Sequence, residues 1–364
     1  MLRAFPLWLS LVASALVGCG GGADAVAVDA SPGAGDGATA DAPPLEEDLE
    51  LVFTPSPVAD LPAGVRFTTV PYGTDGRQVM DAFLPAATAP TAVVIYFHGG
   101  GFVGGSRTSA YAGGANALRR IVGENIAWIG VDYQLLLPIG TETEGVKKSI
   151  GDSRRALQFV KRHAIAFNID PARIGLYGSS AGAGTSLWLA FHDDLAEPTS
   201  DDPIARQSTR PRATAVIETQ ATYDLLRWSP DIFAPTYPVV TTQAMFSVPQ
   251  LADLAMRFYG LPAASGPAAM QAAMETPAIT AYRDEYDMLD LLTADDPPTY
   301  ISNSGSNTTP QNPSQFDLLH HPLHARTLTE RATAVSAMLV ADVPAFDIST
   351  PGGAMDFLVA QLAP

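Results

Sequence analysis

Short apolar runs alternate with amphipathic stretches along most of the chain. Residues 65–72 and 78–84 have the pattern of two strands joined by a glycine-containing turn. Residues 91–97 and 126–133 are almost continuously apolar, which is typical of strands buried on both faces of a sheet. Residues 109–122 lie between them and predict a helix. This order of elements is the one expected of an α/β protein.

The alternation continues toward the C-terminus with one interruption. The predicted elements are helices over 146–168, 183–191, 324–339 and 354–362, and strands over 173–177, 213–219, 299–302 and 345–348. Residues 225–296 break the pattern with mixed helical patches and prolines, so we expect a helical cap insertion there. The whole pattern predicts the α/β class, with a mostly parallel, doubly wound sheet.

The first residues have the features of a secretory leader. Arg3 supplies a positive charge, and residues 4–16 form an uncharged apolar run of 13 residues. Such a run is too short to cross the roughly 30 Å core of a bilayer as a helix. Residues 16–19, L-V-G-C, resemble the lipobox of bacterial lipoproteins, in which the cysteine, here Cys19, is acylated. We therefore expect residues 1–19 to be a lipoprotein signal, and the protein to be lipid-anchored in a bacterial cell envelope, at the periplasmic face or the outer membrane.

Acidic residues dominate the charge of the chain. The formal net charge of −17 argues against nucleic acid and anionic membrane surfaces as partners, so the lipid anchor is the only membrane contact expected. Residues 20–50 hold eight acidic side chains and no basic one, with almost no large apolar residue. They predict a flexible linker. Residues 51–364 then form the folded domain.

Two glycine-rich motifs carry the candidate chemistry. Residues 178–182 read G-S-S-A-G, the strand-to-helix turn that exposes a serine hydroxyl, here that of Ser180. Residues 97–102 read F-H-G-G-G-F, a loop whose N–H groups can complete an oxyanion hole. Each motif follows a predicted strand, so we expect both at the same edge of the sheet. The pair predicts a serine nucleophile for acyl transfer.

The surrounding residues resemble a known superfamily. Residues 131–135, V-D-Y-Q-L, are similar to the V-D-Y-R-L stretch of hormone-sensitive-lipase-like esterases. Residues 170–176, D-P-A-R-I-G-L, are similar to the D-P-x-R-I-x-L lead-in to their serine turn. The likeness runs from about residue 65 to residue 192 and extends to feruloyl-esterase-like (BD-FAE-like) members. It implies the α/β-hydrolase fold and a carboxylic-ester hydrolase of the serine esterase type.

The resemblance also implies which groups form the oxyanion hole. In that superfamily the second and third glycines of the loop donate, and these are Gly100 and Gly101 here. The N–H of Ala181, directly after the serine, completes the set. His98 would brace the loop. Preorganised donors of this kind raise the rate by roughly 10²–10³-fold each.

The position of the base departs from the pattern of the superfamily. There the acid follows the penultimate strand and the histidine follows the last one, whereas here no histidine follows His324 and the acid position holds Asn307. His320 and His321 stand just before Pro322, a favourable first residue of a helix, in the loop after the penultimate strand. A helix N-terminus disfavours a charged imidazole, which suits a neutral base. We therefore predict a relocated base, either His320 or His321.

Two carboxylates are candidates for the acid that orients this base. Asp317 stands three residues before His320, and Asp224, just after the strand predicted over 213–219, is its rival. Outside residues 320–324 no group of histidines and carboxylates has the spacing of metal ligands, so no metal is expected. Nothing in the sequence indicates a cofactor.

The leading hypothesis is an esterase that acts on a small-molecule or polysaccharide-linked ester through an acyl-serine intermediate. A serine peptidase on the same fold is the nearest enzymatic alternative. The missing C-terminal histidine leaves a third possibility open, a non-catalytic binding protein whose hydrolase fold lacks a working base.

Overall fold

The computed structural model describes residues 49–308 and 315–364. The predicted signal with Cys19 lies outside the described residues, and so does the predicted linker over 20–50 except for its last two positions. In the described part of the chain, no helix has both the length and the apolar character needed to cross a bilayer.

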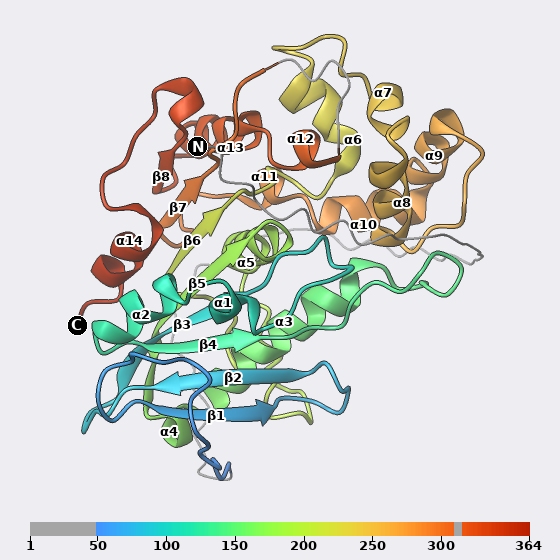
Figure 1. The fold of residues 1–364 in the computed structure, drawn as a ribbon. Helices are drawn as coiled ribbons and strands as arrows, with labels where there is room; N and C mark the ends of the chain where they lie inside the picture. Colours follow the sequence, from blue (N-terminus) through green and yellow to red (C-terminus); the bar gives the residue numbers. More distant parts are fainter. Residues whose placement is uncertain (1–48, 309–314) are drawn as a thin grey trace, which may run out of the picture.

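One eight-stranded sheet runs through the described part of the chain in the order β1-β2-β4-β3-β5-β6-β7-β8 (Figure 1). The pairs β1–β2 and β2–β4 are antiparallel, and all other neighbours are parallel. The strands are β1 (Arg66–Pro71), β2 (Val79–Leu84), β3 (Thr91–Phe97), β4 (Ala127–Val131), β5 (Ile169–Ser179), β6 (Ala213–Ile217), β7 (Thr299–Ser302) and β8 (Leu339–Asp342). The predicted α/β class with a mostly parallel, doubly wound sheet is confirmed.

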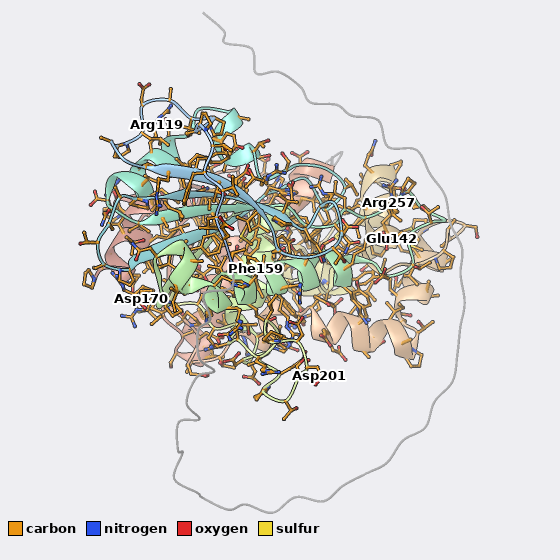
Figure 2. All side chains as sticks on the ribbon, turned by 90° about the horizontal axis from the view of Figure 1, so that it is seen from below. Arg119, Glu142, Phe159, Asp170, Asp201 and Arg257 are labelled. Atoms are coloured by element: carbon orange, nitrogen blue, oxygen red, sulfur yellow. The ribbon has the colours of Figure 1, made fainter. Side chains whose placement is uncertain are left out.

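Helices cover both faces of this sheet. They are α1 (Ser109–Ala112), α2 (Asn116–Gly123), α3 (Val146–Arg162), α4 (Ala164–Phe167), α5 (Ala181–Phe191), α12 (Gln315–Leu319), α13 (Pro322–Val335) and α14 (Gly353–Gln361). The core residues of α3 and α5 pack on one face, and those of α2 and α14 pack on the other. In Figure 2, Phe159 of α3 lies within the molecule, while Arg119, Asp170 and Asp201 lie toward its edges.

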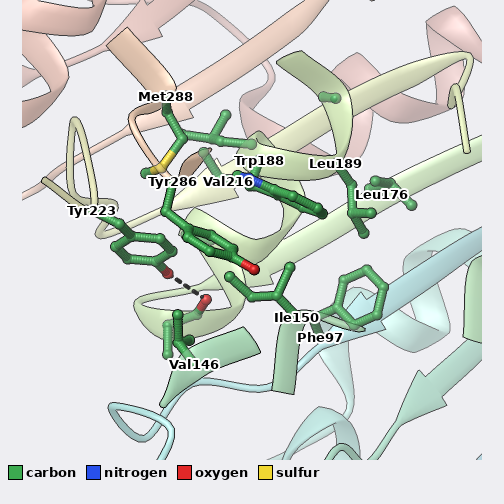
Figure 3. Packing of buried hydrophobic residues seen from close by; sticks show 14 of the residues in the cluster. Phe97, Val146, Ile150, Leu176, Trp188, Leu189, Val216, Tyr223, Tyr286 and Met288 are labelled. Atoms are coloured by element: carbon green, nitrogen blue, oxygen red, sulfur yellow. Dashed lines mark hydrogen bonds between the residues drawn. The ribbon is translucent and has the colours of Figure 1, made fainter. Parts of the chain in front are cut away.

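Strand β3 lies in the middle of the sheet, and its sequence is apolar after the first residue. All seven of its residues are buried, because side chains on a strand alternate between two faces and both faces are covered here. One face receives Val93, Ile95 and Phe97, and the other receives Ala92, Val94 and Tyr96. Figure 3 shows Phe97 close to Ile150 of α3 in the larger of the two clusters.

Short helices fill the segment between β6 and β7. They are α6 (Leu225–Arg227), the π-helical turn η1 (Trp228–Phe233), α7 (Thr242–Phe246), α8 (Pro249–Phe258), α9 (Pro267–Met274), α10 (Pro277–Glu285) and α11 (Met288–Leu291). They are drawn yellow to orange in Figure 1, with α7 to α10 grouped to one side of the sheet. We call residues 225–291 the cap.

The last strand differs from the sequence prediction. The strand expected over 345–348 does not form, and β8 stands earlier in the chain, overlapping only the last residue of the helix predicted over 324–339. Ser336 adopts the left-handed conformation, with a φ of 63°, which ends α13 and allows the chain to turn into β8. Pro344 then begins a 3₁₀ turn, η2 (Pro344–Phe346), where a further strand would need its missing N–H group.

Two predicted helices are each divided. The helix expected over 109–122 is interrupted at Gly113 and Gly114, because glycine is costly inside a helix. The helix expected over 146–168 is interrupted at His163, where α3 ends and α4 begins.

Leu176→Ala is expected to lower the free energy of unfolding by about 2–5 kcal/mol, because it leaves a cavity in the packed face of β5. Leu176 is fully buried, whereas Val239 on the cap is 66% exposed. Val239→Ala is therefore the control, with an expected change within about 0.5 kcal/mol. Urea titration of both variants measures the difference, and equal losses would contradict the assignment of Leu176 to the core.

Candidate active site

Ser180 stands in a strained turn between β5 and α5. Its φ of 54° and ψ of −119° lie outside the regions that a non-glycine residue normally adopts. A Cβ atom at Gly178 would come within 2.1 Å of the Gly182 carbonyl oxygen, and one at Gly182 within 2.0 Å of the Phe97 oxygen. Glycine is therefore required on both sides of the serine, and the backbone can close tightly enough to present the hydroxyl.

The glycine loop lies directly against this turn. A Cβ atom at Gly99 would be 3.3 Å from the Cβ atom of Ser180. Gly100 and Gly101 have φ values of 114° and 60°, which side chains disfavour. Among the described residues no carbonyl or side chain accepts a hydrogen bond from the N–H group of Gly100 or Gly101. With Ala181 opening α5, these donors are available to a developing oxyanion.

His98 braces the loop from below, as the sequence predicts. Its ring stacks on Tyr133 with the centroids 4.1 Å apart, and the Tyr133 hydroxyl donates to the His98 carbonyl over 2.5 Å. Burial lowers the pKa of His98 to about 4, so the imidazole is neutral at pH 7 and its Nδ1–H donates to the Gly99 carbonyl over 2.7 Å. The hydrogen-bonded ring of His98 therefore supports the glycine loop without adding a charge next to it.

The structure brings His320 to the serine. Its Nε2 lies 2.8 Å from the Ser180 Oγ, a hydrogen bond between residues 140 positions apart. Burial lowers the pKa of His320, and the negative charge of Glu218 partly opposes that shift. The predominantly neutral imidazole can accept the hydroxyl proton, which is the task of a general base.

Two buried amides hold the backbone on either side of His320. The Gln220 side chain donates to the Leu319 carbonyl over 2.8 Å. The fully buried Asn303 donates to the His321 carbonyl over 3.3 Å and exchanges two bonds of 2.9 Å with the backbone of Thr219. The loops after β6 and β7 are thereby tied to the chain that carries the imidazole.

His321, the other predicted base, has a different place. Its Nδ1 accepts from the Leu323 N–H over 3.2 Å, which makes it the N-cap of α13, and its Nε2 donates to the Thr308 carbonyl over 3.3 Å. Both ring nitrogens are thus engaged away from Ser180. The sequence did not show which of the two histidines contacts Ser180. The structure does, because the start of α13 directs their rings to different places.

His324 is a third imidazole of this group and is fully buried. Its Nδ1 accepts from the Ala221 N–H over 3.1 Å and its Nε2 donates to the Leu318 carbonyl over 2.8 Å. Burial lowers its pKa to about 3. This neutral ring fastens the loop after β6 to α12 and is part of the framework around the base.

The two predicted acids have different surroundings. Asp317 has an exposed side chain on α12, and its negative charge raises the pKa of His321. Asp224 is buried, and both of its carboxylate oxygens accept from Arg283 of α10 over 2.7 Å. Asp224 therefore joins parts of the cap.

Glu218 is a further carboxylate at this edge of the sheet that the sequence analysis did not consider. Glu218 directly follows β6, and its negative charge opposes the lowering of the pKa of His320 that burial causes. Its position at the end of a strand of the parallel sheet was a usable signal, since such ends gather at one edge. Asn307, at the position usual for the acid, accepts from the hydroxyl of Tyr237 over 2.7 Å.

A cavity of about 540 Å³ opens beside the Ser180 hydroxyl. It is lined mainly by apolar side chains, and α8 supplies a large share of them. The residues that line it are Gly99, Gly100, Gly101, Phe102, Val103, Ser179, Ser180, Ala181, Gln220, Tyr223, Leu225, Trp228, Leu251, Leu254, Ala255, Phe258, Leu319 and His320. The Tyr223 hydroxyl also donates to the Ala181 carbonyl over 2.9 Å, which fixes the first turn of α5 (Figure 3).

Comparisons with known proteins agree with this geometry. Residues 80–246 match the BD-FAE family model. Carboxylesterase patB of Penicillium expansum is 36% identical over 132 residues, which cover 32% of this chain and 24% of that enzyme. Carboxylesterase NlhH of Mycobacterium tuberculosis is 34% identical over 116 residues, covering 32% of this chain and 33% of that enzyme. The matches thus span about a quarter to a third of the length of these curated relatives.

Solved structures share the fold over most of the chain. A truncated carbohydrate esterase from gut microbiota superposes with a TM-score of 0.54 at 15% identity, covering 81% of this chain and 96% of that one. Esterase B from Lactobacillus rhamnosis gives a TM-score of 0.52 at 16% identity, covering 78% and 77%. At such identities the likeness establishes the fold. The strand order and these likenesses show that the chain has the α/β-hydrolase fold, and its residues 80–246 are similar to the BD-FAE family.

Proposed function

We propose that this protein is a serine hydrolase that cleaves carboxylic esters through an acyl-serine intermediate. The observation that carries the proposal is the 2.8 Å hydrogen bond between the Ser180 Oγ and the His320 Nε2. It lies beside backbone donors of the glycine loop and at the mouth of an apolar cavity. The carboxylesterase names of the matched relatives support the same reaction class.

The reaction follows from the placement of these groups. The Ser180 Oγ attacks the acyl carbon while its proton passes to the His320 Nε2, and the carbonyl oxygen becomes an oxyanion. The N–H groups of Gly100, Gly101 and Ala181 are the donors for that oxygen. As the ester C–O bond breaks, the proton moves from His320 to the departing alcohol oxygen. Water then attacks the acyl-serine by the same route, with His320 as base, and releases the acid.

The cavity supports an ester with an uncharged, largely apolar acyl group. Its lining contains no Asp, Glu, Lys or Arg, so a charged acyl group would be desolvated there without a partner. The alcohol part is proposed to be a small molecule or a polysaccharide, and the carbohydrate esterase among the structural neighbours supports the second of these. The lipid anchor at Cys19 stays a prediction from the sequence, and it would hold the enzyme at a membrane surface.

Ser180→Ala and His320→Asn are each expected to reduce kcat toward p-nitrophenyl butyrate by about 10³-fold or more, because nucleophile and base act as a unit. His321→Asn is the matched control, since asparagine is a favourable N-cap and the adjacent histidine keeps its place. It is expected to retain activity within a few-fold. If wild type shows no turnover, the site is a binding site instead, and if His321→Asn alone abolishes turnover, the base is misassigned.

The pH dependence of kcat/KM is expected to have an acidic limb with its midpoint below pH 6.5. Burial lowers the pKa of His320, and the active form is the neutral imidazole, so activity rises with pH through that lowered value and then levels off. Initial rates with p-nitrophenyl butyrate between about pH 4.5 and pH 8 measure the limb. A midpoint clearly above pH 6.5 would contradict a buried histidine as the base.

Leu254→Trp is expected to shorten the acyl chain that the enzyme accepts. Leu254 lines the cavity, with its methyl groups 3.7 Å from the Cβ position of Gly101. The larger ring should lower kcat/KM for p-nitrophenyl octanoate at least about 10-fold more than for the acetate. Val239→Trp, at an exposed position of the cap, should leave the ratio unchanged. Equal effects on both esters would show that the acyl group binds elsewhere.

A further inference from the structure

Three carboxylates of the loops and helices near this edge of the sheet have different surroundings. Asp224 accepts from two nitrogens of the Arg283 guanidinium, Nε and Nη2, and caps α6. The exposed Asp317 acts on the neighbouring His321. A general base becomes positively charged when it takes a proton, and a carboxylate close to it stabilises that charge. Glu218 is the third carboxylate at this edge of the sheet.

Glu218 is built into the same edge as the nucleophile. It directly follows Ile217, whose carbonyl accepts the Ser180 N–H over 3.1 Å. Its own N–H donates to the Ser302 carbonyl over 2.7 Å, which ties it to the end of β7. Its φ of 53° is unfavourable for a residue with a side chain, so the surrounding strands hold it in a conformation that local preference alone would not select.

The side chain of Glu218 is anchored to the segment that lies against His320. Its Oε1 accepts from the N–H group of Ser304 over 3.0 Å and from the Ser304 hydroxyl over 2.5 Å. The next residue, Gly305, lies against the backbone of the base, since a Cβ atom there would be 3.2 Å from the His320 carbonyl oxygen. Two successive residues after β7 thus connect the carboxylate with the histidine.

We propose that Glu218 is the positioning acid of this site, whose carboxylate stabilises the imidazolium that His320 becomes when it takes the Ser180 proton. The inference rests on the proposed esterase function and concerns a residue that acts through the base. Glu218 stays ionised throughout, so no proton is transferred to it. Base and acid then each stand one strand earlier than the sequence resemblance implies, after β7 and β6.

The neighbouring histidines would not stabilise a positively charged His320. His321 and His324 lie within the same turn and the start of α13, and burial lowers the pKa of both. A positive charge on either would oppose one on His320. The charge of Asp317, on α12, opposes the lowering of the pKa of His321, whereas the charge of Glu218, directly after β6, opposes the lowering of the pKa of His320. Removing the charge of Glu218 should therefore lower the pKa of the base.

The test compares Glu218→Gln with Asp317→Asn, both of which neutralise a carboxylate near this histidine pair. With p-nitrophenyl butyrate, Glu218→Gln is expected to lower kcat by about 10²-fold with little change in KM. The acidic limb of its kcat/KM profile should move to lower pH. Asp317→Asn should keep kcat within about two-fold and leave the limb in place. Glu218→Asp, which retains the charge, should recover part of the rate and bring the limb back toward its wild-type position.

The outcomes separate this inference from the proposed function. Loss of turnover in Ser180→Ala and His320→Asn, together with unchanged kcat and limb in Glu218→Gln, overturns the role of Glu218 alone. A wild type without Ser180-dependent turnover overturns the esterase itself. If Glu218→Gln does not fold, as judged by circular dichroism, Ser304→Ala replaces it, because it removes one anchor and keeps the charge. Its kcat should fall several-fold, and an unchanged kcat overturns the proposal.

Discussion

The close approach of three backbone segments at the end of β5 is the constraint on which the site depends. Gly178, Gly182 and the carbonyl of Phe97 leave no space for even one added carbon, with contacts near 2 Å from each Cβ position. Because the segments are fixed against one another, Ser180 is held in an unfavourable conformation and the glycine loop lies beside it. The distance between nucleophile and oxyanion donors is thereby set before any substrate arrives, which lowers the cost of reorganisation during the reaction.

The candidate base, His320, lies at the same edge of the sheet as Ser180, but hydrogen bonds from buried side chains hold it in place. His320 belongs to an irregular segment, and buried amides of Gln220 and Asn303 satisfy the carbonyls on both sides of it. Each amide would be costly to bury without its partners, so the loops after β6 and β7 keep one arrangement. The neutral ring of His324 adds a third connection between them. These hydrogen bonds therefore fix the position of the His320 imidazole, although the residue belongs to neither a helix nor a strand.

Much of the fold could be predicted from local pattern. Apolar runs located β3, β4 and β6, and the two glycine motifs located Ser180 and its donors. The error lies where local preference was weak. The last strand was expected over 345–348 and the helix before it was extended to residue 339, because nothing in the sequence marks Ser336 as the left-handed residue that ends α13. The sequence narrowed the base to His320 or His321 and offered Asp317, with Asp224 as its rival, as the acid.

The order of strands and helices, the serine turn and the glycine loop can be read from the sequence alone, because they depend on side-chain periodicity and on backbone conformations that favour glycine. Which histidine reaches Ser180 depends on the tertiary structure. The residue is 140 positions away along the chain, and the crossover connections of the parallel sheet and the start of α13 bring it there. The tertiary structure also brings Glu218 to the edge of the sheet that carries Ser180, where its negative charge opposes the lowering of the pKa of His320. Charges act through space, and a parallel sheet gathers the ends of strands that are far apart along the chain.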